Sequence, residues 1–263
     1  MPAAKPKRLL TEERRRAVLD LLEKQGRVTV EELTRQFDVS AVTARGDLDV
    51  LSSTGALVRS HGGAVRPLNP VQDYPLRIKK TMYHAEKIRI ARAATQLIRN
   101  HQTVILDSGT TCAEVAANLR RTKPMALTVI THALNIAMEL ADAPNLSLIM
   151  IGGILRQVSS SFVGPQAEQM VRELHADHFF LAVDGLDLEI GLTTPDVLEA
   201  QLNTLMMKAA HEVTIVADAS KFGRRSLSVI GDLSMVKRVI TDDRVSPEYV
   251  DGLRRLGVEV VLA

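Results

Sequence analysis

The chain has 263 residues, 46% hydrophobic and 24% charged, an ordinary composition for a soluble protein large enough for two domains. No apolar run is long enough to span a bilayer, the single cysteine (Cys112) excludes an internal disulfide, and the basic N-terminus lacks the apolar run of a secretory signal, so we expect a cytoplasmic protein with no membrane segment. The net charge of +2 conceals a basic excess in residues 1–66, where 12 Lys and Arg stand against 9 Asp and Glu, as contact with DNA phosphates would require.

The first two predicted helices have clear start and stop signals. One begins near Thr11, and Gly26 ends it. The sequence Thr29-Val-Glu-Glu32 is typical of a capping box, in which side chains and backbone bond reciprocally at a helix start, and it predicts a second helix. Residues at helical spacing form the buried face of that helix: Val30, Leu33 and Phe37.

The stretch Ser40–Leu51 predicts a third helix, entered through a turn at Asp38-Val39. Ser40 can cap it, because the hydroxyl can accept a hydrogen bond from an unpaired backbone N–H. Residues at spacing i, i+4 and i+7 form a buried stripe: Ala44, Leu48 and Leu51. The residues of the opposite face are mostly small or polar: Val42, Thr43, Arg45, Gly46 and Asp49. Such a helix, preceded by a short helix and a tight turn, fits a DNA major groove, although an ordinary amphipathic surface helix has the same pattern.

A small β-hairpin is predicted after Gly55, where the third helix ends. Its first strand, turn and second strand follow in order: Leu57–Ser60, His61-Gly62-Gly63 and Ala64–Arg66. Helices and hairpin together make residues 1–66 a winged helix-turn-helix domain. The hairpin lies where its backbone, with Arg59 or Arg66, could contact phosphates beside the groove.

The pattern of the chain changes after this domain. Three prolines from Pro67 to Pro75 discourage regular structure, so residues 67–83 are predicted as a linker. A long helix is expected from about His84 to Arg99, and short apolar runs follow it: Thr103–Leu106, Leu127–Ile130, Leu146–Ile151, Phe179–Val183, Val213–Ala217, Val239–Thr241 and Glu259–Leu262. Their alternation with helical segments is typical of an α/β domain, residues 84–263, whose mostly parallel sheet is buried on both faces.

Small and polar residues follow several of these strands, at the sheet edge where ligands of α/β domains collect. Asp107-Ser108-Gly109-Thr110-Thr111 opens a helix whose N-terminus favours an anion, so it predicts a phosphate cradle. The other candidates come from strand ends and from a helix that we expect to start with Thr194 as cap and Pro195 in its first turn: Thr131, His132, Gly152, Gly153, Asp184, Gly185, Gly191 and Lys221. Such a set suits a phosphorylated, polyhydroxylated ligand.

Each of these loops can also be explained by turn geometry alone. The chain lacks the Walker lysine pattern and the dinucleotide glycine pattern, which argues against ATP and NAD, and no cofactor is expected. Cys112 and His132 have no partner ligands at metal spacing, so we expect structural roles for them and no metal site.

Residues 1–66 resemble the N-terminal signature of the DeoR family of bacterial sugar-catabolism repressors. The matching positions are Val39-Ser40, Thr43, Arg45, Asp47-Leu48, Leu51, Gly55 and Arg59-Ser60-His61-Gly62-Gly63-Ala64. Ala44 departs from the bulky apolar residue usual in the family, and Gly46 from a polar one at a cost of about 1 kcal/mol in helix propensity relative to Ala. The residues expected to contact double-stranded operator DNA are Ser40, Val42, Thr43, Arg45, Gly46, Arg59 and His61.

The second domain resembles the C-terminal sensor domain of the same family. The residues that carry the resemblance are Asp107–Thr111, Gly152-Gly153, Asp184-Gly185, Gly191–Thr194, Glu199 and Asp218–Gly223, and His132 departs from the Asn usual at its position. The resemblance implies a fold similar to ribose-5-phosphate isomerase and the CoA transferases, with phosphorylated sugars bound as inducers. It adds Glu199 to the expected effector-binding residues.

An isomerase-like enzyme fused to a DNA-binding domain is the main alternative. Asp184, Asp187 and Glu199 could serve as acid and base, but these isomerases have a lysine between their carboxylates, and residues 188–198 contain no Lys or Arg. We therefore expect no catalysis. A structural nucleoid protein fits poorly with so elaborate a second domain.

The expected function is that of a DNA-binding transcriptional regulator. It represses a sugar-catabolism operon, and a phosphorylated sugar bound in the C-terminal domain relieves the repression. One recognition helix reads few base pairs, so we expect a homo-oligomer, a dimer or a tetramer, on paired half-sites.

Overall fold

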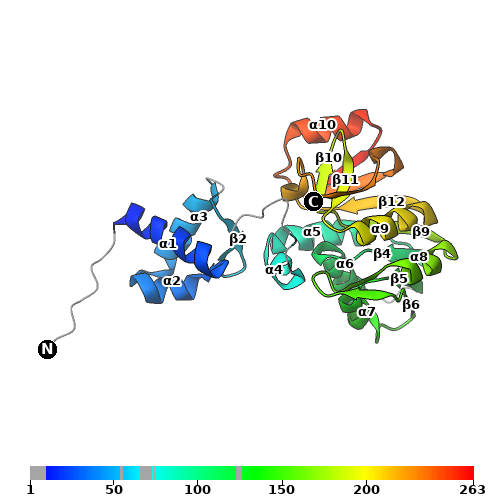
Figure 1. The fold of residues 1–263 in the computed structure, drawn as a ribbon, viewed down its shortest axis with the longest axis horizontal. Helices are drawn as coiled ribbons and strands as arrows, with labels where there is room; N and C mark the ends of the chain where they lie inside the picture. The colour runs from blue at the N-terminus through cyan, green and yellow to red at the C-terminus, as the bar shows by residue number, and fades with distance from the viewer. Residues whose placement is uncertain (1–9, 54–55, 66–72, 74, 123–125) are drawn as a thin grey trace. The chain divides into compact units, whose positions relative to one another are not determined.

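The structure is a computed structural model that describes residues 10–53, 56–65, 73, 75–122 and 126–263 (Figure 1). The chain divides into two compact units, which are described separately: one contains Met1–Asn69 and Lys80–His84, and the other contains Pro70–Lys79 and Ala85–Ala263. Among the described residues, no helix combines the length and the hydropathy that crossing a membrane requires.

The N-terminal unit is a winged helix-turn-helix, as expected. Its helices are α1 (Thr11–Gln25), α2 (Val30–Phe37) and α3 (Ala41–Ser53), and its strands are β1 (Arg27–Thr29), β2 (Val58–Ser60) and β3 (Gly63–Val65). The strands form an antiparallel sheet in the order β1-β3-β2. Strand β1 was not expected from the sequence, and it passes so close to β3 that a Cβ at Gly63 would overlap the Val28 carbonyl.

The helix ends of this unit confirm the predicted signals. Gly26 adopts φ 75° and donates its N–H to the Leu22 carbonyl at 2.9 Å. The Thr29 hydroxyl accepts from the Glu32 N–H at 3.1 Å while the Glu32 carboxylate accepts from the Thr29 N–H at 2.7 Å, which completes the capping box. The tail before residue 10, Gly55 and Arg66 lie outside the described residues.

A buried ion-pair cluster fixes α3 against α1. Arg14 Nε lies 2.5 Å from Asp47 Oδ2, and Arg15 Nε lies 3.0 Å from Asp47 Oδ1. Asp47 is on the buried face of α3, beside the core residues Leu48 and Leu51. Removal of one partner from a buried ion pair commonly costs about 3–5 kcal/mol, so this cluster holds the recognition helix in place.

The C-terminal unit is built on a seven-stranded parallel sheet in the order β15-β14-β12-β9-β4-β5-β6. Its strands are β4 (Thr103–Leu106), β5 (Leu127–Thr131), β6 (Leu146–Met150), β9 (Ala176–Leu181), β12 (Ala210–Val216), β14 (Arg238–Thr241) and β15 (Glu259–Leu262). All seven correspond to the predicted apolar runs. The α/β class is therefore confirmed.

Helices cover both faces of this sheet (Figure 1). One core lies under α5 (His84–Thr95), α6 (Thr110–Arg121) and α7 (Leu134–Leu140), and the other under α8 (Pro165–Arg172), α9 (Val197–Ala209) and α10 (Pro247–Arg255). Adjacent residues of β9 enter opposite cores, Phe179 with α8–α10 and Phe180 with α5–α7. Burial on both faces explains why these strands are continuous apolar runs.

Three predictions in this unit need correction. Helix α4 (Leu76–Thr81) lies inside the expected linker, and α5 ends at Thr95 instead of Arg99. Helix α9 starts at Val197 with Asp196 as its cap, so Thr194 and Pro195 do not open it. Thr194 does not open α9 because it lies in strand β11 (Gly191–Thr194), which pairs with β10 (Gly185–Asp187) and β13 (Ser228–Gly231).

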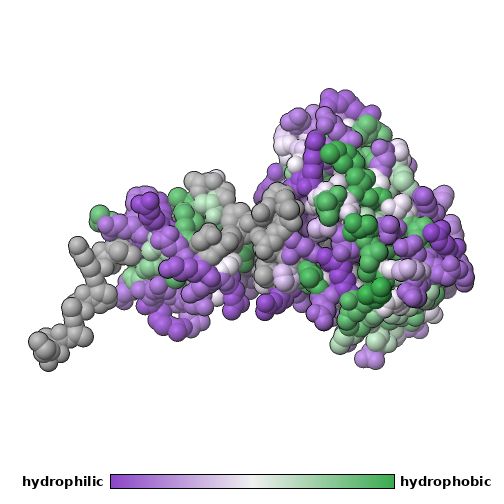
Figure 2. Space-filling model, viewed as in Figure 1, coloured by the Kyte–Doolittle hydropathy of each residue, from purple (hydrophilic) through white to green (hydrophobic). Residues whose placement is uncertain are grey.

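Large apolar side chains also reach the surface of the C-terminal unit. Met138, Ile154 and Leu227 are 70%, 56% and 80% exposed, and Ile154 belongs to the hairpin of β7 (Ile154–Arg156) and β8 (Ser161–Val163). Figure 2 shows hydrophobic residues gathered across the viewed face of this unit. Apolar surface of this kind is common where proteins associate.

Candidate functional site

A cavity opens at the carboxyl ends of β4 and β9, within the C-terminal unit. The chain runs from β4 outward to β5 and β6, and then returns to place β9 on the other side of β4, so the strand order reverses at this point. Ligands of open α/β sheets bind at such a switch point. The cavity has about 590 Å³ of empty space, including its opening to solvent.

More than half of the expected effector-binding residues line this cavity. They are Asp107, Ser108, Gly109, Thr110, Thr111, Asp184, Glu199 and Lys221. They come from the end of β4, the start of α6, the end of β9, helix α9 and the turn after β12. Segments far apart in the sequence therefore meet at one sheet edge, as predicted.

The other expected residues do not line the cavity: Thr131, His132, Gly152, Gly153, Gly185 and Gly191. Thr131 is fully buried and donates its hydroxyl to the Leu106 carbonyl at 2.8 Å. Three of the glycines pack against backbone: a Cβ at Gly153 would lie 2.6 Å from the Val163 carbonyl oxygen, and those at Gly185 and Gly191 would overlap carbonyls of residues 224 and 231. Close packing explains these three glycines without a ligand.

The expected phosphate cradle has the geometry of an anion site. Gly109 adopts φ 108° and caps α6, so the backbone turns from the strand end directly into the helix. Thr110 and Thr111, the first two residues of α6, line the cavity. The first N–H groups of a helix have no intrahelical partner and carry partial positive charge, and both properties favour a bound anion.

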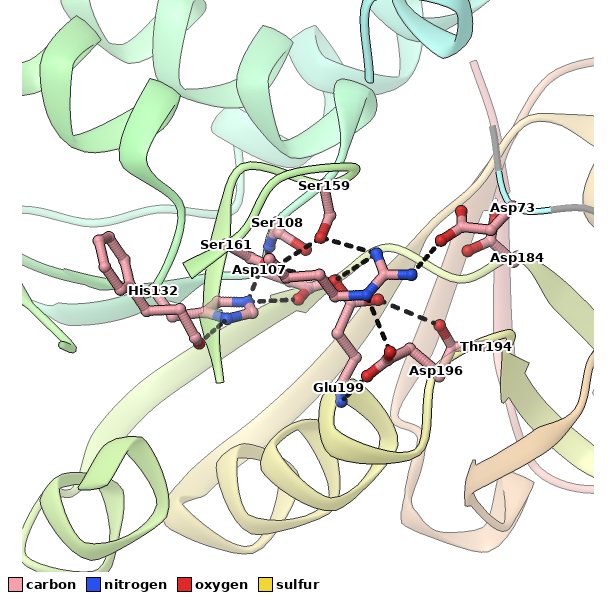
Figure 3. Close-up of polar contacts among 12 residues, drawn as sticks. Asp73, Asp107, Ser108, His132, Ser159, Ser161, Asp184, Thr194, Asp196 and Glu199 are labelled. Carbon is pink, nitrogen blue, oxygen red and sulfur yellow. Dashed lines mark hydrogen bonds and ion pairs between the residues drawn. The ribbon is translucent and has the colours of Figure 1, made fainter. Parts of the chain in front are cut away.

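Below this loop, Asp107 and His132 form a buried pair (Figure 3). The Ser108 N–H donates to His132 Nε2 at 3.1 Å, Nε2 lies 2.9 Å from Asp107 Oδ1, and Nδ1 lies 3.0 Å from the Phe162 carbonyl oxygen. Because the carbonyl requires a proton on Nδ1, the contact to Asp107 requires a further proton. The two side chains together therefore hold one proton more than a neutral imidazole and an ionised carboxylate would.

The pKa values of this pair follow from the contacts. Burial alone would lower the pKa of His132, but the hydrogen bond with the Asp107 carboxylate and the negative charge of that carboxylate outweigh burial and raise the pKa. Burial raises the pKa of Asp107, and the bond to His132 offsets only part of that rise. His132 thus supports the loop from beneath and does not line the cavity.

Three lysines line the cavity: Lys79, Lys87 and Lys221. Lys79 Nζ lies 2.9 Å from Asp184 Oδ1, and Lys221 Nζ lies 3.4 Å from the same oxygen. Burial would raise the pKa of Asp184, but these two lysines outweigh it and hold the pKa well below its usual range. The carboxylate therefore remains ionised beside two ammonium groups.

Lys87 is only 3% exposed, and its Nζ donates to the Lys79 carbonyl at 2.6 Å. Burial, together with the nearby charges of Lys221 and Lys79, lowers the pKa of Lys87 to about 8 against the attraction of Asp218. The three lysines and the α6 N-terminus therefore provide hydrogen-bond donors in a cavity that the carboxylates of Asp107, Asp184 and Glu199 also line.

Arg156 forms a network of ion pairs that includes Glu199, a residue that lines the cavity. Arg156 pairs with Asp73, with Asp196 at 2.9 Å and with Glu199 at 3.5 Å, and it donates to the Ser159 hydroxyl at 2.9 Å (Figure 3). Asp73 also contacts Lys79 Nζ at 3.2 Å. Asp73, Leu76 and Lys79 belong to the segment expected as a linker, and the last two line the cavity.

Sequence analysis missed several lining residues, chiefly Lys79, Lys87, Ser159 and Asn203. Lys79 lies in a segment that the prolines led us to expect without regular structure. Lys87 could have been found, because it lies three residues before Ile90 and four before Ala91 and so shares the buried face of α5. Thr194 lines the cavity too, but from β11 and not as a helix cap.

The expected DNA-contacting residues lie on α3 and the hairpin of the N-terminal unit. Val42 is 77% exposed, and Thr43, Arg45 and Gly46 are also exposed. The Ser40 hydroxyl accepts from the Thr43 N–H at 3.1 Å and lies 2.9 Å from the Thr43 hydroxyl, so it caps α3 as predicted. This solvent-facing surface is available to a groove.

The hairpin residues are held by local contacts. Arg59 Nε lies 3.0 Å from Asp49 Oδ1, and its Nη1 donates to the Gly63 carbonyl at 3.0 Å. His61 is exposed in the turn between β2 and β3. Arg59 is therefore fixed between the recognition helix and the wing, where a phosphate would compete with Asp49.

Comparisons with known sequences place the two units in one group of proteins. The DeoR-like helix-turn-helix domain matches residues 14–68, and the DeoR C-terminal sensor domain matches residues 82–243. The putative aga operon transcriptional repressor of Escherichia coli O157:H7 is 40% identical over 96% of this chain and 94% of that protein. The glycerol-3-phosphate regulon repressor of Escherichia coli K12 is 33% identical over 88% of this chain and 90% of that protein.

Other matches are more distant. The lactose phosphotransferase system repressor of Lactococcus lactis is 30% identical over 89% of this chain and 92% of that protein. Among solved structures, ribose 5-phosphate isomerase A of Methanocaldococcus jannaschii is 16% identical with a TM-score of 0.41 over 54% of this chain and 56% of that chain.

Proposed function

Because the chain belongs to the DeoR family of transcriptional regulators, we propose that it represses a sugar-catabolism operon and that a phosphorylated sugar relieves the repression. The N-terminal unit binds operator DNA through α3, with Thr43 and Arg45 at base edges and Val42 available to a thymine methyl group. Arg59 and His61 on the hairpin contact phosphates beside the groove.

The effector binds in the cavity at the switch point of the sheet. The observation that carries this proposal is the convergence of the α6 N-terminus with Lys87 and Lys221 on one cavity. Helix N–H groups and ammonium groups together suit a phosphate. The names of the relatives, which concern the aga operon, lactose transport and glycerol 3-phosphate, agree with a sugar or polyol phosphate.

Effector binding then changes the operator affinity of the chain. The segment that contains Asp73 and Lys79 lies between the two matched domains in sequence, and it contributes Lys79 to the cavity and Asp73 to the Arg156 network. A phosphate beside Lys79 competes with Asp73 and Asp184 for this ammonium group. Ligand binding is thereby coupled to the chain segment that leads from the DNA-binding domain to the sensor.

The isomerase alternative fits the geometry less well. Asp187, one of the three candidate carboxylates, does not line the cavity but is paired with Arg225 at 2.8 Å and accepts the N–H groups of Glu189 and Ile190. Lys79 and Lys221 contact Asp184 although both lie outside residues 188–198, where the sequence has no lysine. Conversion of an aldose phosphate to its ketose by the purified protein, abolished by Asp184→Asn, would establish the enzyme instead.

A thermal-shift screen tests the effector proposal. We expect a phosphorylated sugar or polyol to raise the melting temperature, while the same compound without its phosphate does not, because a ligand of the folded state stabilises it by mass action. Lys221→Met should reduce the shift, since it removes one of the cationic groups of the cavity. No shift with any phosphorylated compound would refute the proposal.

A further inference from the structure

Asn203 is a buried amide inside the cavity whose hydrogen-bonding capacity is not used. It is 4% exposed, it lies on α9, and it lines the cavity. Its Oδ1 atom has no hydrogen-bond partner among the described residues. Three other buried side-chain atoms of the described chain share this condition, in Asn135, Arg224 and Thr241, but none of those residues lines the cavity.

The other acceptors on this wall are already occupied. Glu199 lies one helical turn before Asn203, so both project from the same face of α9. Its Oε1 accepts from the Ser161 hydroxyl at 2.8 Å and lies 3.5 Å from Arg156 Nη1, and its Oε2 lies 3.4 Å from the Thr194 hydroxyl. Asn203 therefore provides the free acceptor of this wall, whereas the α6 N-terminus and the lysines provide donors.

From this arrangement we propose that Asn203 reads a hydroxyl group of the effector. The inference rests on the proposed function, because it names the residue that contacts the hydroxylated part of a ligand whose phosphate binds at Thr110 and Thr111. A hydroxyl can donate to Oδ1, but the dianionic phosphate group of a sugar phosphate and a keto oxygen have no proton to donate. A buried acceptor that a ligand leaves unpaired weakens binding, so Asn203 selects for a hydroxylated carbon skeleton against phosphate alone.

The test compares two probes, inorganic phosphate and the sugar or polyol phosphate that gives the largest thermal shift, by calorimetric titration of the full chain. Asn203→Leu has a similar volume but no hydrogen-bonding group. We expect it to lose at least about tenfold in affinity for the hydroxylated phosphate and to keep its affinity for inorganic phosphate within about twofold.

Asn135→Leu is the matched control, because Asn135 Oδ1 is also buried without a partner but lies outside the cavity. It should change neither affinity. Since Asn203→Leu removes an unpaired polar group, it should melt no lower than the wild type without ligand, and Asn203→Ser repeats the titration if the leucine variant does not fold.

The outcomes separate this inference from the proposed function. Unchanged affinity of Asn203→Leu for the hydroxylated phosphate would overturn the inference, and so would an equal loss for both probes, which indicates a packing role. A wild-type chain that binds neither probe would overturn the proposed function and this assignment together.

Discussion

At the scale of single residues, His132 and His178 have different pKa values in the folded and the unfolded chain, so the stability of the sensor unit depends on pH. In the unfolded chain His132 loses its proton near pH 6.5, whereas in the folded chain the pair with Asp107 retains it. Folding stability contributed by this proton is complete below pH 6.5 and is lost as pH rises toward the raised pKa of His132. The stability of the sensor unit should thus decline above pH 6.5.

His178 has the opposite effect. Its Nε2 lies 2.7 Å from the Thr214 hydroxyl and its ring stacks on Phe180, and burial lowers its pKa to about 4, an effect to which Arg238 adds. The unfolded chain binds this proton below pH 6.5 while the folded chain does not, so stability falls as pH decreases from 6.5 toward 4. His178 therefore limits stability on the acidic side of pH 6.5.

The first prediction is that His132→Asn removes the decline on the alkaline side. The wild type should lose up to about 1.4 kcal/mol of unfolding free energy per pH unit as the pH rises above 6.5. Asparagine can donate to Asp107 at every pH, so the variant should be flat in this window. Urea unfolding followed by circular dichroism measures both, and a wild type that is already flat would contradict the shared proton.

The second prediction concerns Lys87, whose pKa of about 8 leaves it half neutral at pH 8. A phosphate in the cavity favours the ammonium form, so binding at pH 8 should take up protons. Calorimetry of a sugar phosphate in two buffers with different ionisation enthalpies should give different binding enthalpies for the wild type. Lys87→Met should abolish the difference, and equal enthalpies in the wild type would place the phosphate away from Lys87.

At the scale of elements, α3 and the wing have separate tasks. Arg45 is exposed on α3, whereas Arg59 is fixed between Asp49 and the Gly63 carbonyl. The third prediction is that Arg45→Ala weakens binding to an operator selected from random duplexes by about 1–3 kcal/mol more than binding to random duplex. Fluorescence anisotropy at several salt concentrations measures both.

Arg59→Ala is the comparison variant for this measurement. As a phosphate contact, Arg59 should contribute equally to both DNAs, and its removal should reduce the salt dependence of binding. Equal losses on both DNAs for Arg45→Ala would show that Arg45 positions the helix and does not read bases.

The elements of the fold were predictable to the extent that each one carries its own pattern. The inner strands of the main sheet are short, continuous apolar runs because both of their faces are buried, and the capping box and Gly26 mark helix ends locally. Strands β1 and β13 pair with strands far along the chain, and β7 with β8 and β10 with β11 form short hairpins that lack a continuous apolar run. That pairing also turned an expected helix start at Thr194 into a strand.

The site was predictable where it follows strand ends and unpredictable elsewhere. Asp107–Thr111 could be found because a strand, a glycine and a helix start are adjacent in sequence. Asn203 and Lys79 could not, since each looks like an ordinary helical residue until the fold brings it to the cavity. Gly153, Gly185 and Gly191 were expected in the site but do not line the cavity. Close backbone packing requires glycine just as a ligand-binding loop does, so the sequence does not distinguish the two.

At the scale of the whole molecule, the proposal requires a homo-oligomer. A single α3 contacts too few base pairs for useful specificity, so we propose that copies of the chain place α3 on paired half-sites. The exposed apolar residues of the C-terminal unit, including Met138, Ile154 and Leu227, provide surface for such association. Family membership of the chain, expected from its motifs, is confirmed by the matches over both domains.

The central claim is that a phosphate bound at the start of α6 controls DNA binding. Thr110→Glu places a carboxylate where the phosphate belongs, and charge repulsion and lost volume should prevent effector binding. Ala117→Glu, a half-buried position later in α6 that does not line the cavity, adds the same charge as a control.

The decisive measurement is therefore the operator affinity of these chains with and without the sugar phosphate that gives the largest thermal shift. We predict that the wild type and Ala117→Glu release the operator when it is added, whereas Thr110→Glu binds the operator with wild-type affinity and does not respond. A Thr110→Glu chain that binds the operator and releases it at the wild-type effector concentration would contradict the account.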